Sequence, residues 1–294
     1  MLLIFGFYQE VIDLSWKRSE RLIDMTYYLL NHPKELTPLT YFSDKYKAAK
    51  SSISEDLTIL KNTFQEQGIG TLVTVPGARG GVLFYANTKE SKIQPFIEEL
   101  RQLIQKPDRL LPGGYLYLAD IVGNPQIVDR VGKMFASLYA DKNIDAVITV
   151  ATKGIPLAYA TAKFLNVPVV IVRRDTEITE GSMVSINYVS GSTKRIQTMT
   201  LARRSLSEGS TVLIVDDFMK AGGTIRGMMS LLEEFQAHVA GICVLVESAV
   251  VEQRLVDQYV SIVRLTHVDA EERKIEVQEG NFLGVFKQIE QKGE

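Results

Sequence analysis

Residues 212–224 read VLIVDDFMKAGGT, and this stretch decides the fold of the larger part of the chain. Four apolar residues, 212–215, open it in the manner of a central strand that is buried on both faces of a parallel sheet. Asp216 and Asp217 follow at the carboxyl end of that strand, and a short loop leads to 221–224. Beyond the loop, apolar residues recur with the spacing of one helix face. The predicted order is therefore strand, acidic pair, glycine loop and helix.

The start of this predicted helix suits an anion, because its N–H groups and the positive end of its dipole point at the loop. The carboxylates of Asp216 and Asp217 suit ribose hydroxyls or a hydrated Mg²⁺. An Asp-Asp or a Gly-Gly pair alone is common in a turn after a strand. Here both pairs follow one buried strand, in a fixed order and spacing before a helix. The stretch is neither a Walker loop nor a Gly-x-Gly-x-x-Gly fingerprint. It resembles the motif with which type I phosphoribosyltransferases bind 5-phosphoribosyl 1-pyrophosphate (PRPP).

Length and composition suit a soluble globular protein of one large or two ordinary domains, with 294 residues, 46% apolar and 23% charged. The net charge of −2 does not indicate nucleic-acid binding by the protein as a whole, so any DNA binding must come from a local surface. One cysteine, Cys243, and three histidines argue against a disulfide framework or a zinc cluster and fit a reducing cytoplasm. No apolar run has the length of a membrane span.

The amino-terminal part has the layout of a winged helix-turn-helix. Helices are predicted over 17–31, after the Thr37-Pro38 pair, and from a capping box formed by Ser52 and Glu55. Residues 69–86 then change to the composition of a hairpin with a glycine-rich tip. The predicted domains are an extension outside the core fold (1–16), a winged-helix domain (17–88) and an α/β domain (89–294).

In a winged helix the third helix enters the major groove, and the hairpin tip reaches phosphate or the minor groove. Over residues 17–90, ten Lys or Arg stand against eight Asp or Glu, which decides little. The alternative is that three amphipathic helices serve only for dimer contact, and the pattern alone leaves both open. The candidate DNA contacts are Lys50, Ser51, Ser52, Ser54, Thr58, Lys61 and, at the hairpin tip, Arg79.

A connector is predicted over 87–112. From residue 114 onward, predicted strands and helices alternate, and this alternation is typical of a doubly wound α/β domain. Ligand sites of such domains lie at the carboxyl ends of the strands. The predicted strands are 114–120, 145–152, 167–174, 212–218 and 239–247, and the predicted helices lie near 125–140, 155–165, 222–236 and 250–258.

A second anion loop follows the strand 145–152. It consists of Thr152, Lys153 and Gly154, and the proline two residues later suits the first turn of a helix whose N–H groups face the strand end. Type I phosphoribosyltransferases have their pyrophosphate loop here and a mobile hairpin where this chain has the long polar insertion 175–200. Tyr115 and Phe218 are candidates to stack on a purine ring, although core packing is the commoner role of aromatic residues.

From about residue 17 the whole chain resembles the purine operon repressors of Gram-positive bacteria. The segments that carry the resemblance are KSSISEDLTILK, EQGIGTLVTVPGARGGV, TVATKGIPLAYA and VLIVDDFMKAGGT. The resemblance implies a homodimeric, non-enzymatic regulator of purine-synthesis genes that binds operator DNA and PRPP. It further implies that Asp216 and Asp217 hold the ribose diol, that Ala221, Gly222, Gly223 and Thr224 hold the 5′-phosphate, and that Thr152–Gly154 hold the pyrophosphate. Some relatives bind a guanosine alarmone in the same pocket and some are activators, which leaves the direction of regulation open.

Lys220 separates this chain from one group of the related enzymes. Hypoxanthine phosphoribosyltransferases have an aspartate base at this position, and a cation cannot take a proton from a purine nitrogen at neutral pH, although it can pair with phosphate. The sequence also shows no segment that would form a hood over a nucleobase. Both points favour sensing over catalysis. The alternatives are a catalytic purine phosphoribosyltransferase with an amino-terminal dimerisation domain, and a PRPP-binding assembly protein without affinity for DNA.

Overall fold

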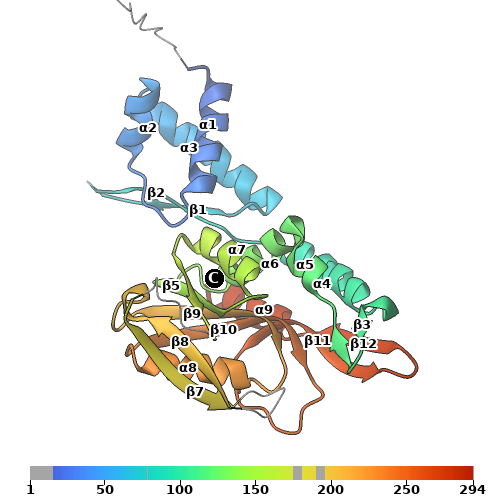
Figure 1. Cartoon of the computed structure of the whole chain (residues 1–294). Helices are drawn as coiled ribbons and strands as arrows, with labels where there is room; N and C mark the ends of the chain where they lie inside the picture. Colours follow the sequence, from blue (N-terminus) through green and yellow to red (C-terminus); the bar gives the residue numbers. More distant parts are fainter. Residues whose placement is uncertain (1–15, 78, 175–180, 190–195, 294) are drawn as a thin grey trace, which may run out of the picture. The chain divides into compact units, whose positions relative to one another are not determined.

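The computed structural model describes residues 16–77, 79–174, 181–189 and 196–293, which divide into two compact units (Figure 1). Unit 1 contains residues up to Gln67 and the segment Leu72–Phe84. Unit 2 contains Gly68–Thr71 and the chain from Tyr85 onward. The predicted extension, 1–16, lies outside the described residues except for Trp16.

Unit 1 is a winged helix, as the pattern predicted. Its elements are α1 (Arg18–Asn31), α2 (Leu39–Tyr46), α3 (Lys50–Gln67), β1 (Thr71–Val75) and β2 (Gly81–Tyr85), with the two strands paired as a hairpin. The apolar stripe of α3 is buried against the other helices and the hairpin, which leaves its polar stripe on the surface.

Two predicted helix starts are displaced. Thr37 is not the N-cap of α2, because its N–H and carbonyl pair with Val82 of the hairpin at 3.0 and 2.9 Å, and the cap is Pro38. Helix α3 begins at Lys50, so Ser52 lies in its first turn and not at its cap.

A buried charge joins α1 to α3. The Asp56 side chain is 1% exposed, and its two oxygens accept hydrogen bonds from the Nε atoms of Arg18 and Arg21, each at 2.9 Å. A buried carboxylate without such partners costs several kcal/mol. This cluster, which was not predicted from the sequence, ties α1 to α3.

Unit 2 is built on a six-stranded sheet. The strand order is β12-β11-β10-β9-β5-β6, in which β12 is an antiparallel edge strand and the other neighbouring pairs are parallel. This confirms the doubly wound α/β fold. The strands span Ala146–Val150 (β5), Val169–Val172 (β6), Thr211–Met219 (β9), His238–Ser248 (β10), Val260–Asp269 (β11) and Lys274–Glu279 (β12).

Both faces of this sheet are covered (Figure 1). Leu213 and Val215 of β9 pack on one side, and Val212 and Ile214 pack on the other, as period-two strand geometry requires. The first side is covered by α4 (Glu90–Ile104), α5 (Ala119–Val122), α6 (Pro125–Ser137), α7 (Ile155–Leu165) and α9 (Phe282–Gly293), and the second by α8 (Gly223–Glu233) and a hairpin of β7 (Met183–Val189) and β8 (Ile196–Ala202). Within the described ranges, no helix is both long and apolar enough to cross a membrane.

Three regions differ from the predicted elements. The predicted strand 114–120 is reduced to β4 (Tyr115–Leu116), paired with β3 (Leu110–Leu111), because Gly113 and Gly114 turn the chain with positive φ and Leu118 leads into α5. The predicted helix 250–258 is irregular chain. No element was predicted after residue 258, where β11, β12 and α9 lie. The described parts of the 175–200 insertion form the hairpin of β7 and β8; 175–180 and 190–195 lie outside the described residues.

Candidate functional sites

A cavity of about 860 Å³ lies at the carboxyl ends of the parallel strands of unit 2. Every ligand contact predicted from the sequence lines it except Gly154, which is buried next to it. These lining residues come from a hairpin before α5, the loop after β5, and β9 with the loop that follows it. They are Tyr115, Thr152, Lys153, Asp216, Asp217, Phe218, Lys220, Ala221, Gly222, Gly223 and Thr224.

The two acids lie within β9, which continues to Met219. Asp216 is 4% exposed, and one of its oxygens accepts a hydrogen bond from the N–H of Asp217 at 3.0 Å. Burial, and then the neighbouring carboxylate, raises the pKa of Asp216, and burial also raises the pKa of Asp217, against the charge of Lys153. Two carboxylates with little water around them are ready to accept hydrogen bonds from hydroxyl groups or to bind a cation.

The loop after β9 presents backbone N–H groups at the cavity. Lys220 is exposed at its start, Gly222 has φ +91°, and α8 begins at Gly223. The first N–H groups of a helix have no carbonyl partner within the helix, and here they belong to residues that line the cavity.

The loop after β5 is the second loop that the sequence predicted to bind an anion. Thr152 and Lys153 are exposed, and α7 begins at Ile155 with a proline in its first turn. Gly154 is required for space, because a Cβ there would lie 2.2 Å from Oγ1 of Thr149 and 2.8 Å from Oδ1 of Asp216. This loop therefore packs directly against Asp216 of the neighbouring strand.

The sequence analysis missed one wall of the cavity. This wall consists of Ser248 at the end of β10, Val250 just after it, and Leu265, His267 and Val268 on β11. Parallel strands end at the same sheet edge, so a prediction of β11 would have found this wall. Tyr115 is 62% exposed, whereas Phe218 lines the cavity and also packs against the core; stacking of either ring on a purine stays a prediction.

The DNA-contact candidates of unit 1 lie on α3 and at the tip of the hairpin. The exposed candidates of α3 begin with the adjacent Lys50 and Ser51 and continue at spacings of three or four residues outside the buried stripe, and Ser52 is half-buried. Arg79 is exposed at the hairpin tip. The candidates that we call the α3 face are Lys50, Ser51, Ser54, Thr58 and Lys61.

Known proteins match both units. Residues 17–86 match the family model "Bacterial purine repressor, N-terminal", and residues 118–278 match "Phosphoribosyl transferase domain". The purine biosynthesis transcriptional repressor PurR of Bacillus subtilis is 61% identical over 93% of this chain and 96% of its own length. The chain belongs to the PurR family. A second PurR relative, a purine biosynthesis transcriptional activator of Lactococcus lactis, is 47% identical over 91% of this chain and 98% of its own length.

A solved enzyme structure matches only part of the chain. An adenine phosphoribosyltransferase of Thermoanaerobacter pseudethanolicus covers 57% of this chain and 99% of its own, with 21% identity and a TM-score of 0.50. This likeness shows the phosphoribosyltransferase fold. The PurR family thus adds a winged helix ahead of a fold that an enzyme has by itself.

Proposed function

We propose that this chain regulates transcription of purine-biosynthesis genes by binding operator DNA with the α3 face and Arg79, and PRPP in the cavity of unit 2. The observation that carries the proposal is the meeting of an acidic pair and two anion loops in one cavity, in a chain whose other unit is a winged helix. The relatives matched along nearly the whole chain are named as regulators of transcription.

PRPP has a ribose diol between a 5′-phosphate and a pyrophosphate, and the cavity offers a suitable group for each. Asp216 and Asp217 accept the diol hydroxyls, residues 221–224 take the 5′-phosphate, and residues 152–154 take the pyrophosphate. Lys153, Arg174 and Lys220 line the cavity and oppose the phosphate charge. Mg²⁺ accompanies the pyrophosphate in the proposal, because carboxylate and phosphate oxygens are its preferred ligands.

The chain is a regulator and not an enzyme. Its near-full-length relatives are regulators, and its position for a catalytic base holds Lys220, which at neutral pH is a poor proton acceptor. The fold of unit 2 is the one observation that favours the alternative, a catalytic purine phosphoribosyltransferase.

The proposed form of action is a homodimer that represses transcription in the cytoplasm. Dimeric helix-turn-helix proteins read two half-sites, which a single winged helix does not span. Repression is favoured because the relative named a repressor is 61% identical and the relative named an activator 47%. A guanosine alarmone has phosphates that suit the same loops and would compete with PRPP.

The test measures DNA binding by fluorescence anisotropy with a duplex from upstream of the purine-biosynthesis genes and with a scrambled duplex. We expect tighter binding to the first, with affinity falling as salt rises. Equal, salt-independent binding to both duplexes would contradict the proposal. A parallel assay mixes the protein with PRPP and each purine base; multiple turnovers to nucleotide would establish the enzyme instead.

A further inference from the structure

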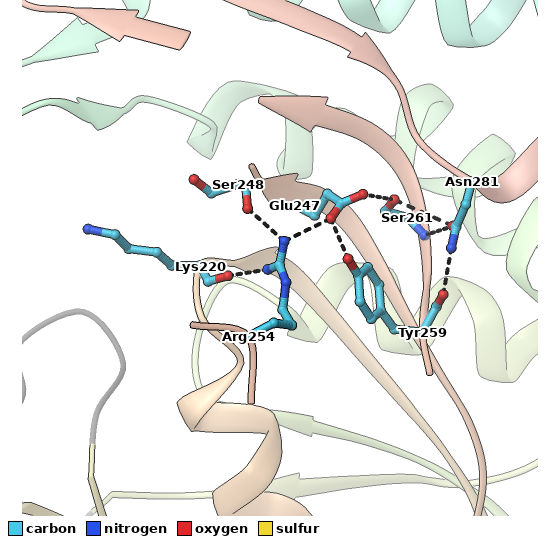
Figure 2. A network of polar contacts seen from close by, with 7 residues as sticks. All are labelled: Lys220, Glu247, Ser248, Arg254, Tyr259, Ser261 and Asn281. Carbon is cyan, nitrogen blue, oxygen red and sulfur yellow. Dashed lines mark hydrogen bonds and ion pairs between the residues drawn. The ribbon is translucent and has the colours of Figure 1, made fainter. Parts of the chain in front are cut away.

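In the connection between β10 and β11, residues 249–259, Arg254 and Leu255 bind the loop after β9 but do not line the cavity; the contacts of Arg254 are drawn in Figure 2. The guanidinium of Arg254 donates hydrogen bonds to the carbonyl oxygens of Lys220 and, at 2.8 Å, Ser248. The N–H of Leu255 donates to the carbonyl oxygen of Ala221 at 2.8 Å. Two consecutive carbonyls of the loop are therefore held by this connection.

Holding these carbonyls orients the N–H groups of the loop. In a planar trans peptide, the carbonyl and the following N–H point in opposite directions. The carbonyls of Lys220 and Ala221 point toward the connection, so the N–H groups of Ala221 and Gly222 point away from it. Both residues line the cavity. Successive N–H groups directed into a concave site form an anion-binding nest.

A buried carboxylate keeps Arg254 in place. The side chains of Arg254 and Glu247 are 18% and 6% exposed, and their Nη2 and Oε2 atoms are 3.0 Å apart. Glu247 also accepts hydrogen bonds from the hydroxyl of Tyr259 and, at 2.9 Å, from that of Ser261 (Figure 2). Burial and the Glu247 carboxylate raise the pKa of Tyr259 to about 12, so its hydroxyl remains a donor at neutral pH.

We propose that Arg254 and Glu247 are positioning residues of the effector site, which fix loop 220–222 for a sugar 5-phosphate. Neither residue lines the cavity, and the Lys220 side chain extends away from Arg254 (Figure 2). Arg254 acts through the loop backbone and does not touch the ligand. A buried ion pair contributes little net stability compared with apolar residues, which fits a role in fixing geometry. The inference rests on the proposed function in assigning a phosphate to this loop.

The two loops proposed to bind anions are held in place by different residues. Arg254 and Leu255 bind the loop after β9, whereas Gly154 in the loop after β5 rests on Thr149 and Asp216. Loss of the Arg254 contacts should therefore weaken the binding of a sugar phosphate and leave the binding of pyrophosphate unchanged. A change that merely damaged unit 2 would weaken both ligands.

The test uses isothermal titration of the full chain with ribose 5-phosphate and, separately, with inorganic pyrophosphate. The main variant is the double substitution Arg254→Met and Glu247→Gln, which removes the guanidinium without leaving a buried carboxylate unpaired. We expect ribose 5-phosphate to bind about tenfold more weakly, because a preorganised loop is lost, with pyrophosphate unchanged. Arg254→Lys, which keeps the charge beside Glu247, should lose less. Arg130→Met is the matched control, since Arg130 forms an exposed ion pair with Glu99 elsewhere in unit 2.

Three results would overturn the inference. The first is unchanged binding of ribose 5-phosphate to the double variant, which would show that the loop holds its shape without Arg254. In that case the proposed function would still stand, provided that the wild type binds both ligands. Equal losses for the two ligands would make the pair merely structural. Failure of the wild type to bind either ligand would refute the proposed function as well. If the double variant does not fold in a thermal melt, the same comparison is read from Arg254→Lys.

Discussion

The α3 face and the cavity of unit 2 are both polar, but they are built in opposite ways. The α3 face consists of side chains that project separately from a helix whose opposite stripe is buried. The groups proposed to bind ligand in the cavity are backbone N–H groups, often at glycines, and two carboxylates of which one, Asp216, is buried, and Gly154 packs against Asp216. Independent groups contribute additively to binding, whereas groups in contact do not. Losses on the α3 face should therefore add, and single changes in the cavity should remove most of its function.

The largest expected effect is on PRPP binding by the double variant Asp216→Asn and Asp217→Asn. Hydrogen bonds to charged groups contribute about 1.5–3 kcal/mol each, so loss of the diol contacts should weaken PRPP at least roughly 100-fold. Isothermal titration measures this loss. Asp129→Asn, which changes a half-exposed acid paired with Lys163, is the control and should bind like the wild type. A loss of PRPP affinity smaller than about tenfold would show that the acidic pair does not contact the ligand.

Gly154→Ala should have the next largest effect. Its Cβ would lie 2.2 Å from Thr149 Oγ1, so the pyrophosphate loop must move, and pyrophosphate should bind about tenfold or more weakly, as misplaced packing of 1–3 kcal/mol implies. Gly284→Ala is a matched control, because a Cβ there meets nothing within 4 Å. DNA binding without ligand should be the same in both variants. Wild-type pyrophosphate affinity in Gly154→Ala would show that the loop is not a ligand site.

Smaller losses are expected on the α3 face. Lys50→Ala, Lys61→Ala and Arg79→Ala should each weaken DNA binding and reduce the slope of log affinity against log salt by about 0.9, which is the value for one phosphate contact. The triple variant should show the sum of the three changes. Lys274→Ala, on β12 of unit 2, is the control. An unchanged slope in the triple variant would refute the α3 face, and a total loss in any single variant would refute its additivity.

The smallest expected effect is on stability. Burial raises the pKa of Asp216 above its ordinary value of 3.8, so the folded chain holds this proton more tightly than the unfolded chain. The resulting stabilisation is present at low pH and is lost as pH rises through the folded pKa. Ligand-free Asp216→Asn carries no charge to bury, so at pH 7.5 it should melt at a higher temperature than the wild type. The difference should be about 2–4 °C for each kcal/mol gained in the free energy of unfolding.

Calorimetry at pH 7.5 and pH 5 tests this sign. The difference between Asp216→Asn and the wild type should shrink at pH 5, because the wild-type carboxyl then gains its proton at less cost. A wild type that melts above the variant at pH 7.5 would mean that the carboxylate is stabilised in the empty cavity. The acidic pair would then not be held ready for a ligand.

Local signals made most of the fold and half of the site predictable. The runs of apolar residues in β5, β6, β9 and β10 are typical of buried parallel strands, and glycine in the loops after β5 and β9 locates those two loops. The sites at those strand ends followed from the rule for α/β sheets. The α3 face followed from helical spacing alone.

Long-range contacts decided the remainder. Residues 250–258 have apolar spacing that fits a helix, but the backbone of Leu255 bonds to Ala221 and the side chain of Arg254 bonds to Lys220. The partners of Glu247 lie up to fourteen residues further along, at Ser261, and are brought together only by the pairing of β10 with β11. Spacing in one sequence carries no signal for such contacts.

The central claim is that ligand binding in unit 2 controls DNA binding by unit 1, and titration of PRPP into a preformed complex with operator DNA tests it directly. Anisotropy of the labelled duplex reports release. A ligand shifts such an equilibrium only through its different affinity for the two states, so a variant that cannot hold PRPP must stay bound. We predict that PRPP releases the wild type and leaves the Asp216→Asn and Asp217→Asn double variant on the DNA. Release of the double variant at the wild-type PRPP concentration would contradict the account.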